Sequence, residues 1–158
     1  VWARPANNSS IRITPALYRD KLIFGTDGKI SSVCFKTGRS DWETGLKGKK
    51  VSEFLLRKDK IYFVTYERTN DSWLYCLDVS KGSVVWSRKL DHWNFRKPAF
   101  AGGVWIGGNE IQCFNETTGK MKFKHAWEMA DCHSVIGSWD SIVVSNPYGY
   151  IAKVSIKR

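Results

Sequence analysis

The sequence lacks any long apolar run. Within its 158 residues, no stretch approaches the ~20 consecutive apolar residues that a membrane-spanning helix needs. It also lacks a glycine-rich phosphate-binding loop, because Gly102-Gly103 and Gly107-Gly108 flank one predicted strand and are interpreted as turns. No signal peptide is visible, but the chain begins at Val1 rather than Met, so its start indicates nothing about targeting.

Acidic residues are scarce, with 15 Asp and Glu against 25 Lys and Arg, for a formal net charge of +10. Asp140, Asp131 and Glu128 are scattered and do not form the cluster of carboxylates that a calcium site requires. The excess of basic residues favours acidic partners such as nucleic acid, anionic lipid or acidic protein. It is equally compatible with a role in solubility and in protecting sheet edges.

Catalytic constellations are also missing. The chain has only three histidines. Ser134 follows His133, but neighbours in a strand point to opposite faces, so they do not form a nucleophile–base pair. Cys132 and His133 have no further ligands at a spacing typical of metal sites. We therefore predict no catalytic residue, no metal site and no enzymatic activity.

What the chain does contain is a succession of short strands. Between Lys58 and Leu90, three β-branched and aromatic runs are separated by the polar segment 68–72 and by the turn Ser80-Lys81-Gly82. The runs span 61–64, 73–77 and 83–86. Because no helical periodicity separates them, they predict an antiparallel meander.

The same pattern recurs along the chain. The turn glycines Gly38, Gly82 and Gly119 lie 44 and 37 residues apart, close to the ~40–45 residues of one propeller blade. We predict an all-β propeller of about four four-stranded blades, each too small to bury its own faces. It would form a single domain over 1–158, with repeats at roughly 14–44, 53–90, 98–127 and 134–158, and residues 1–3 completing the last.

A second recurrence concerns an aromatic residue in the outermost strand. Trp42, Trp86 and Phe123 each follow a turn glycine by four residues, and Trp2 precedes Trp42 by 40 residues. The last copy has no turn glycine or outer strand. Residues 1–3 are therefore expected to close the ring, and their deletion should destabilise it. The alternatives are half of a larger ring formed by two chains, or a fragment of a longer protein.

The outer strand at 120–124 alternates Lys with apolar residues. The apolar face is expected to pack inward, while the lysines protect an exposed edge and do not form a binding site.

Three of the four cysteines are assigned to one repeat position. Cys34, Cys76 and Cys113 are placed in the third strand of successive copies, with Ala152 in the fourth. Positions one blade apart are too distant for a disulfide, which needs Cα atoms within ~7 Å. We expect reduced thiols, which favours a cytoplasmic setting. Glycosylation triplets at Asn7, Asn8, Asn70 and Asn115 keep a secreted or lumenal one open.

The segment 74–86, LYCLDVSKGSVVW, resembles the repeat of quinoprotein-type (PQQ-like) β-propellers. The resemblance implies that a small residue, a turn glycine and a Trp recur in each blade, with the Trp docked between blades. Enzymes of that family bind a quinone with calcium, often against an adjacent Cys–Cys pair that is missing here, so no cofactor is expected. Its non-enzymatic members act as scaffolds, receptors or assembly factors.

Propeller partners usually bind the face formed by loops that leave an outer strand, together with the second-to-third-strand loops. Here the former loops are rich in basic residues with interleaved aromatic ones. The predicted binding residues are Arg4, Arg12, Lys47, Lys49, Lys50, His92, Trp93, Arg96, Lys97, Trp127 and His133. Taken singly, Trp93 and Trp127 also fit packing within the core or between blades.

We therefore predict a non-catalytic scaffold propeller, monomeric or homodimeric, that engages an acidic protein partner through this basic face. The first alternative is a nucleic-acid-binding module, in which basic groups bind phosphates and aromatic rings stack on bases. A further alternative is a carbohydrate-binding propeller that uses rim Trp residues, for which Asn94 and Asp91 are the nearby polar groups.

Overall fold

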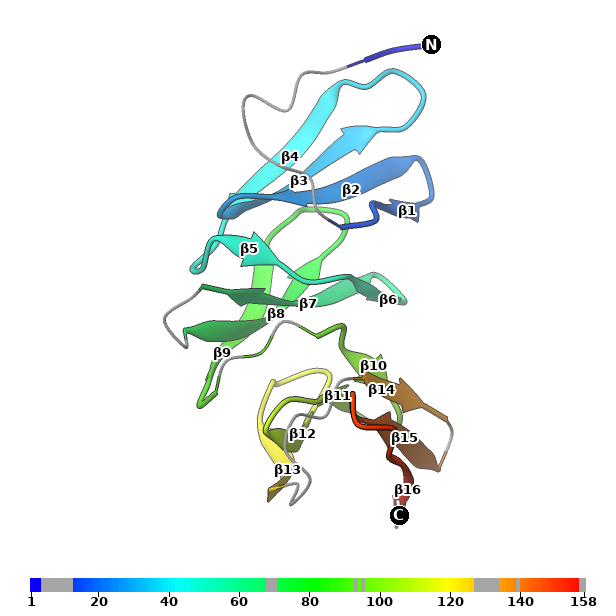
Figure 1. The fold of residues 1–158 in the computed structure, drawn as a ribbon. Coiled ribbons are helices and arrows are strands. Elements are labelled where there is room, and N and C mark those ends of the chain that lie inside the picture. The colour runs from blue at the N-terminus through cyan, green and yellow to red at the C-terminus, as the bar shows by residue number, and fades with distance from the viewer. Residues whose placement is uncertain are drawn as a thin grey trace.

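The computed structural model describes residues 1–3, 13–67, 71–92, 94, 96–126, 134–138 and 140–156. Within these ranges all regular structure is β, and no helix is present that could cross a membrane. The strands form four antiparallel sheets that follow one another along the chain. Figure 1 shows them stacked from the first sheet at the top to the last at the bottom.

The four sheets are built from consecutive strands, and β5 of the second sheet lies before the repeat expected at 53–90. The first sheet contains β1 (Ala16–Tyr18), β2 (Lys21–Thr26), β3 (Lys29–Cys34) and β4 (Ser40–Gly45). The second contains β5 (Lys50–Val51), β6 (Leu55–Arg57), β7 (Lys60–Tyr66), β8 (Ser72–Asp78) and β9 (Val84–Leu90). The third contains β10 (Ala99–Phe100), β11 (Val104–Ile106), β12 (Glu110–Phe114) and β13 (Met121–Ala126). The fourth contains β14 (Ser134–Gly137), β15 (Ser141–Ser145) and β16 (Ile151–Ser155).

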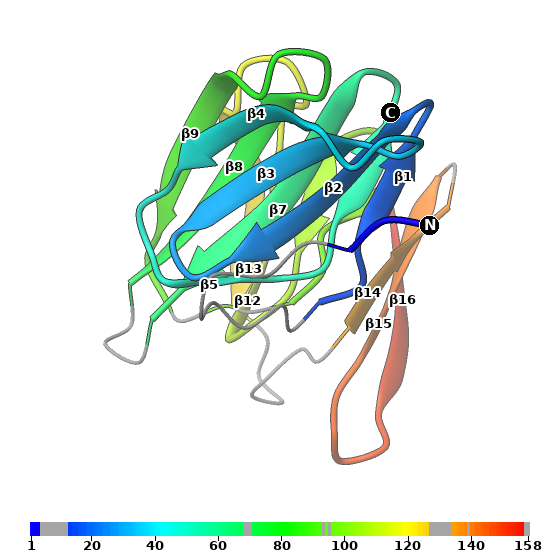
Figure 2. The same cartoon turned by 90° about the horizontal axis from the view of Figure 1, so that it is seen from above.

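Apolar layers between neighbouring sheets form the core. Because successive residues of a strand point to opposite faces, one strand contributes to two layers. In β8, Tyr75 and Leu77 pack toward the first sheet, while Leu74 and Cys76 pack toward the third. A third layer joins the last two sheets and includes Ile142. Figure 2, seen from above, shows the first sheet lying over β7, β8 and β9. The stack is the radial arrangement predicted for a propeller.

Tryptophans connect the sheets at the turns between third and fourth strands. The indole Nε1 of Trp42 donates to the carbonyl of Val79 at 3.0 Å, and that of Trp86 donates to Glu116 at 3.1 Å. Trp2 donates in the same way to Phe35 at 2.9 Å. Trp2 therefore occupies the predicted repeat slot, and the expected docking of Trp between blades is confirmed.

The predicted cysteine column is wrong for the first copy. In the turns between third and fourth strands, the backbone N–H of Gly38 donates to the backbone carbonyl of Cys34, and that of Gly82 donates to the backbone carbonyl of Asp78. Cys34 is thus equivalent to Asp78. Ser32, which pairs with Trp42 as Cys76 pairs with Trp86, occupies the cysteine position in the first sheet.

The fourth copy needs the same kind of correction. The backbone N–H of Ile156 donates to the carbonyl of Asp140, as that of Val79 donates to the carbonyl of Asp59. Ile156 is therefore equivalent to Val79, and three residues earlier Lys153, not Ala152, is equivalent to Cys76. Cys34, Cys76 and Cys113 are nevertheless free thiols in three different sheets.

Ring closure stays a prediction. The fourth sheet has three strands among the described residues, and residues 1–3 form no strand. Figure 1 places residues 1–3 and β16 at opposite ends of the stack.

Candidate partner-binding face

Two loops that leave outer strands lie on one edge of the stack. They are the β4–β5 connection, residues 46–49, and the β9–β10 connection, residues 91–98. In Figure 1 the β4–β5 connection and the end of β9 both lie on the left-hand side. The turns between second and third strands, including 27–28 and 107–109, lie on the same edge because adjacent strands are antiparallel. We call this edge the loop face.

The β4–β5 connection is held by its backbone. The N–H of Gly28 donates to the carbonyl of Lys49 at 2.9 Å, and the Thr65 hydroxyl donates to the carbonyl of Lys47 at 2.6 Å. Because the main chain is fixed in this way, the lysine side chains are the groups left to face solvent. Lys47 places its Nζ 4.4 Å from the centre of the Trp73 ring, a cation–π contact.

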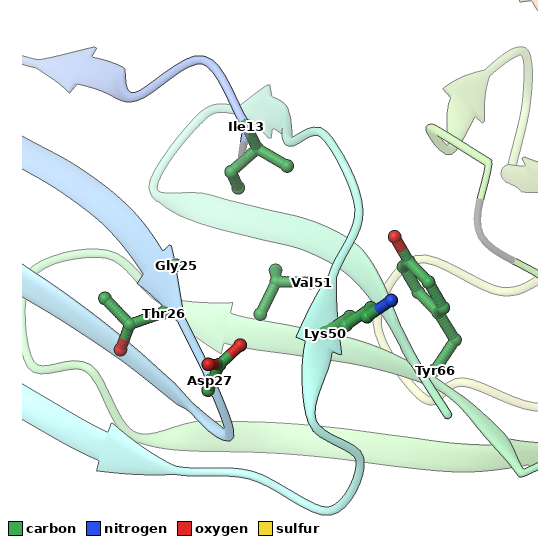
Figure 3. A pocket seen from close by; sticks show the side chains of 7 residues that line it. All are labelled: Ile13, Gly25, Thr26, Asp27, Lys50, Val51 and Tyr66. Atoms are coloured by element: carbon green, nitrogen blue, oxygen red, sulfur yellow. The ribbon is translucent and has the colours of Figure 1, made fainter. Parts of the chain in front are cut away.

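Lys49 and Lys50 have no acidic partner in the described part of the chain. Lys49 is exposed, and Lys50 is half-buried at a small open pocket. Figure 3 shows Lys50 and Tyr66 on one side of this pocket and Asp27 on the other. No carboxylate oxygen of a described residue lies within the 4.0 Å of an ion pair from either ammonium. Both charges are therefore available to a ligand.

The β9–β10 connection is anchored by a buried asparagine. The backbone N–H of Asn94 donates to the Ser72 hydroxyl at 2.8 Å, and its side-chain amide donates to the carbonyl of Gly107. Its Oδ1 accepts the backbone N–H of Arg96 at 2.9 Å. Asn94 is 5% exposed, which removes one of the two polar groups offered for carbohydrate binding.

An ion pair joins the loop face across two sheets. The Nζ of Lys97 lies 3.8 Å from Glu53 Oε2, which follows the β4–β5 connection in the chain. Both side chains are more than half exposed, so the pair is worth at most ~1 kcal/mol. Its value is positional, because it shows that the two basic loops are neighbours.

His92 lies in a cluster of charges near β12 and β13. Its Nε2 is 3.6 Å from Glu110 Oε1, while Lys124 Nζ lies 3.0 Å from Glu110 Oε2 and 2.9 Å from Asp91 Oδ2. Hydrogen bonds to Asp91 and Glu110 raise the pKa of Lys124. Burial favours a raised pKa for Glu110, but the hydrogen bonds from Lys124 and Gln112 outweigh it and lower the pKa. Asp91, Glu110 and Lys124 are therefore all charged at neutral pH.

Of the predicted binding residues, six are described and lie on the loop face: Lys47, Lys49, Lys50, His92, Arg96 and Lys97. Arg4, Arg12, Trp93, Trp127 and His133 lie outside the described residues. The structure therefore brings together the basic residues of the two central loops.

Sequence reasoning missed the acidic side chains that the second-to-third-strand turns bring to this face. Asp27 and Glu110 flank such turns, and Asp71 pairs with Lys89 at 2.8 Å. The prediction considered charges only in the loops that leave outer strands, and it therefore described a face more uniformly basic than the observed one. The repeat register was the available signal, because it places the turn that holds Asp27 and the turn that precedes Glu110 at equivalent positions.

The described residues do not fit a quinone–calcium site. No group of three or more His, Cys, Asp or Glu side chains among them could hold a metal ion. Ser134 shares a hydrogen bond of 2.9 Å with Ser145, and His133 lies outside the described residues.

Four stacked sheets with a tryptophan docked at each turn glycine define a PQQ-like repeat β-propeller. The family described as outer membrane protein assembly factor BamB matches residues 54–149. This match spans more than half of the chain, so the chain belongs to that family. No curated protein matches it.

Solved structures share the fold at low sequence identity. BamB from Moraxella catarrhalis is 19% identical with a TM-score of 0.73, over 92% of this chain and 47% of that one. The computationally designed protein Ika4 is 14% identical with a TM-score of 0.75, over 95% and 93% of the two chains. The quinohemoprotein alcohol dehydrogenase from Comamonas testosteroni is 19% identical with a TM-score of 0.61, over 74% and 21%. The chain spans about half the length of that BamB.

Proposed function

We propose that this chain is a non-catalytic scaffold propeller whose loop face binds an acidic segment of a partner protein. The observation that carries the proposal is the pair Lys49 and Lys50, which have no carboxylate partner among the described residues and lie beside a second basic loop. An acidic segment placed across both loops would meet Lys49, Lys50, Arg96 and Lys97 together.

The family supports a protein partner over other classes. Its description names an assembly factor, and such factors act by binding proteins.

Binding to defined acidic peptides tests the proposal. The probes are a series of synthetic peptides with rising Glu and Asp content, and the readout is fluorescence anisotropy at several salt concentrations. The variant Lys49→Glu, Lys50→Glu, Arg96→Glu, Lys97→Glu should lose at least about tenfold in affinity, since several ion pairs of a few tenths to 1 kcal/mol each are reversed.

The matched control reverses the same number of charges elsewhere. Lys36, Arg39, Lys81 and Lys120 lie at turns between third and fourth strands, on the opposite edge of the stack. Reversing them gives the same net charge as the loop-face variant. Peptide affinity should stay within about twofold of that of the unmodified chain, because only long-range electrostatics changes. Equal losses in both variants would show that net charge, and not the loop face, accounts for binding.

Nucleic acid is the alternative partner. Single- and double-stranded oligonucleotides in the same assay should bind more weakly than acidic peptides at every salt concentration. Tight oligonucleotide binding that weakens steeply with salt, and that is lost only in the loop-face variant, would assign the face to nucleic acid instead.

A further inference from the structure

A second small pocket opens on the loop face, between the second and third sheets. Leu90 and Ile106 form its apolar part, and both are almost fully buried. Glu110 and Gln112 line it from β12, while His92 and Asn109 line it from exposed loop positions. The pocket thus has an apolar interior, a polar wall and an opening to solvent.

The polar wall contains a buried acceptor with no hydrogen-bond partner among the described residues. Gln112 is 4% exposed, and its Nε2 donates to Glu110 Oε2 at 2.9 Å. Its Oε1 is buried and accepts no hydrogen bond from any residue that the structure describes. A buried acceptor left unsatisfied is unfavourable, because it has lost the hydrogen bonds that water would give it. The arrangement is therefore stabilised by any ligand that brings an N–H or O–H group to this atom.

The second acceptor is the other oxygen of Glu110. Its Oε2 accepts a hydrogen bond from Gln112 and pairs with the Lys124 ammonium, whereas its Oε1, within the described part of the chain, contacts His92 Nε2 at 3.6 Å. Asp91, Glu110 and Lys124 together carry two negative charges and one positive charge. A locally negative site with two acceptors favours a cationic donor, although the chain as a whole is strongly basic.

We infer that this pocket binds the side-chain ammonium of a lysine carried by the protein partner. An ammonium has three N–H donors and no acceptor, so it can donate to Gln112 Oε1 and Glu110 Oε1 at once. Its methylene chain would lie along Leu90 and Ile106. The inference rests on the proposed function for the partner, and adds that the acidic segment carries one lysine.

The test uses methylammonium as the probe and the side chain of Gln112 as the reporter. Gln112 is the only glutamine in the chain, so labelling with side-chain ¹⁵N-glutamine yields one NH₂ group in the ¹H–¹⁵N spectrum. Methylammonium chloride is titrated at constant ionic strength, with tetramethylammonium chloride as the matched cation that has no N–H donor.

Methylammonium should produce a saturable shift of the Gln112 resonances, and tetramethylammonium should produce none. Glu110→Met should weaken methylammonium binding at least about tenfold, because it removes the charge at the second acceptor and, unlike Glu110→Gln, adds no second labelled NH₂ group. Asp27→Asn removes a carboxylate from the other pocket of the loop face and should leave the titration unchanged.

Two outcomes would overturn the inference. Equal shifts with both salts would mean a non-specific response to cations, and no shift with either would mean that Gln112 Oε1 holds a bound water only. The titration on the unmodified chain decides between them even if Glu110→Met does not fold.

Failure of this inference can be told apart from failure of the proposed function. Lys49, Lys50, Arg96 and Lys97 do not line the pocket, so their reversal should leave methylammonium binding in place. If acidic peptides bind the loop face while methylammonium does not, the lysine pocket alone is wrong.

Discussion

Single glycines decide how closely the sheets of this propeller approach. Gly82 has a φ of 70°, and a Cβ added there would lie 2.4 Å from atoms of the Trp42 ring. Gly119 meets Trp86 in the same way, at 2.6 Å. Glycine is therefore needed at these turns for two reasons: the backbone is left-handed, and the tryptophan ring leaves no room for a Cβ.

Replacing Gly82 by alanine separates these two requirements. Gly82→Ala should lower the free energy of unfolding by about 3 kcal/mol, through backbone strain plus displacement of the Trp42 ring. Gly102→Ala is the control, because Gly102 has a φ of 61° but nothing lies within 4 Å of an added Cβ. It should cost only about 1 kcal/mol. Equal losses in urea unfolding would show that the ring contact contributes nothing.

Cys34 is a second residue whose position sets its chemistry. It occupies the turn position of Asp78 and Asn115, whose side-chain oxygens accept backbone N–H groups. Hydrogen bonds from the Thr37 side chain and from the Thr37 and Lys36 backbone lower the pKa of the Cys34 thiol. Burial instead raises the pKa of Cys76 and of Cys113 to about 11.

The thiols should therefore react at different rates. A lowered pKa leaves more thiolate at pH 7, so Cys34 should react with iodoacetamide at least about tenfold faster than Cys76 or Cys113. Thr37→Val should slow Cys34 at pH 7, because it removes the hydroxyl that stabilises the thiolate. Peptide mapping by mass spectrometry assigns each site. Similar rates for all three thiols would contradict this account of the turn.

Strands differ in how much of their surface the stack covers. In β7 and β8 five of the seven residues are buried, whereas every residue of β13 is exposed. The expected inward packing of the 120–124 strand is therefore wrong. Phe123 is 41% exposed although it contacts Trp105, because no following turn covers it among the described residues as turns cover Trp42 and Trp86.

Hydrogen exchange should follow this order of burial. Amides of β7 and β8 lie between two apolar layers and should open only on global unfolding, while those of β13 and β16 open locally. Protection factors measured by NMR should differ by at least about a hundredfold, equivalent to roughly 3 kcal/mol. Uniform protection across the sheets would indicate that the stack unfolds as one unit.

At the scale of the whole molecule, the open question is what Trp2 contributes. Its ring packs on Gly38 of the first sheet, although residues 1–3 belong to no strand. Trp2 therefore occupies the slot of an outer-strand tryptophan from a preceding blade. This arrangement is compatible with a closed ring and with a longer array of blades.

Deleting residues 1–3 distinguishes the two. We expect amides of β3 and β4 to lose protection from hydrogen exchange, because Trp2 covers the turn between them. A simultaneous loss in β16 would be the signature of a ring closed by these residues. Trp2→Phe is the control, since it keeps an aromatic ring in the slot and should retain most of the protection.

The sequence by itself determined the number of sheets, most strand positions and the tryptophan slot. These features depend on local patterns, since short β-branched and aromatic runs and a glycine turn repeat at nearly constant spacing. The cysteine column was misplaced because residue counts cannot show which side chain caps a turn, and Cys34 is chemically unlike Asp78.

Only the tertiary structure decided the character of the loop face. Glu53 and Lys97 are 44 residues apart in the sequence, yet they form an ion pair. Gln112 has the sequence context of an ordinary strand residue, and only the folded chain shows that its side-chain oxygen is buried without a hydrogen bond from any described residue. Charge pairing and burial depend on which segments the stack brings together, and local sequence carries no record of those distances.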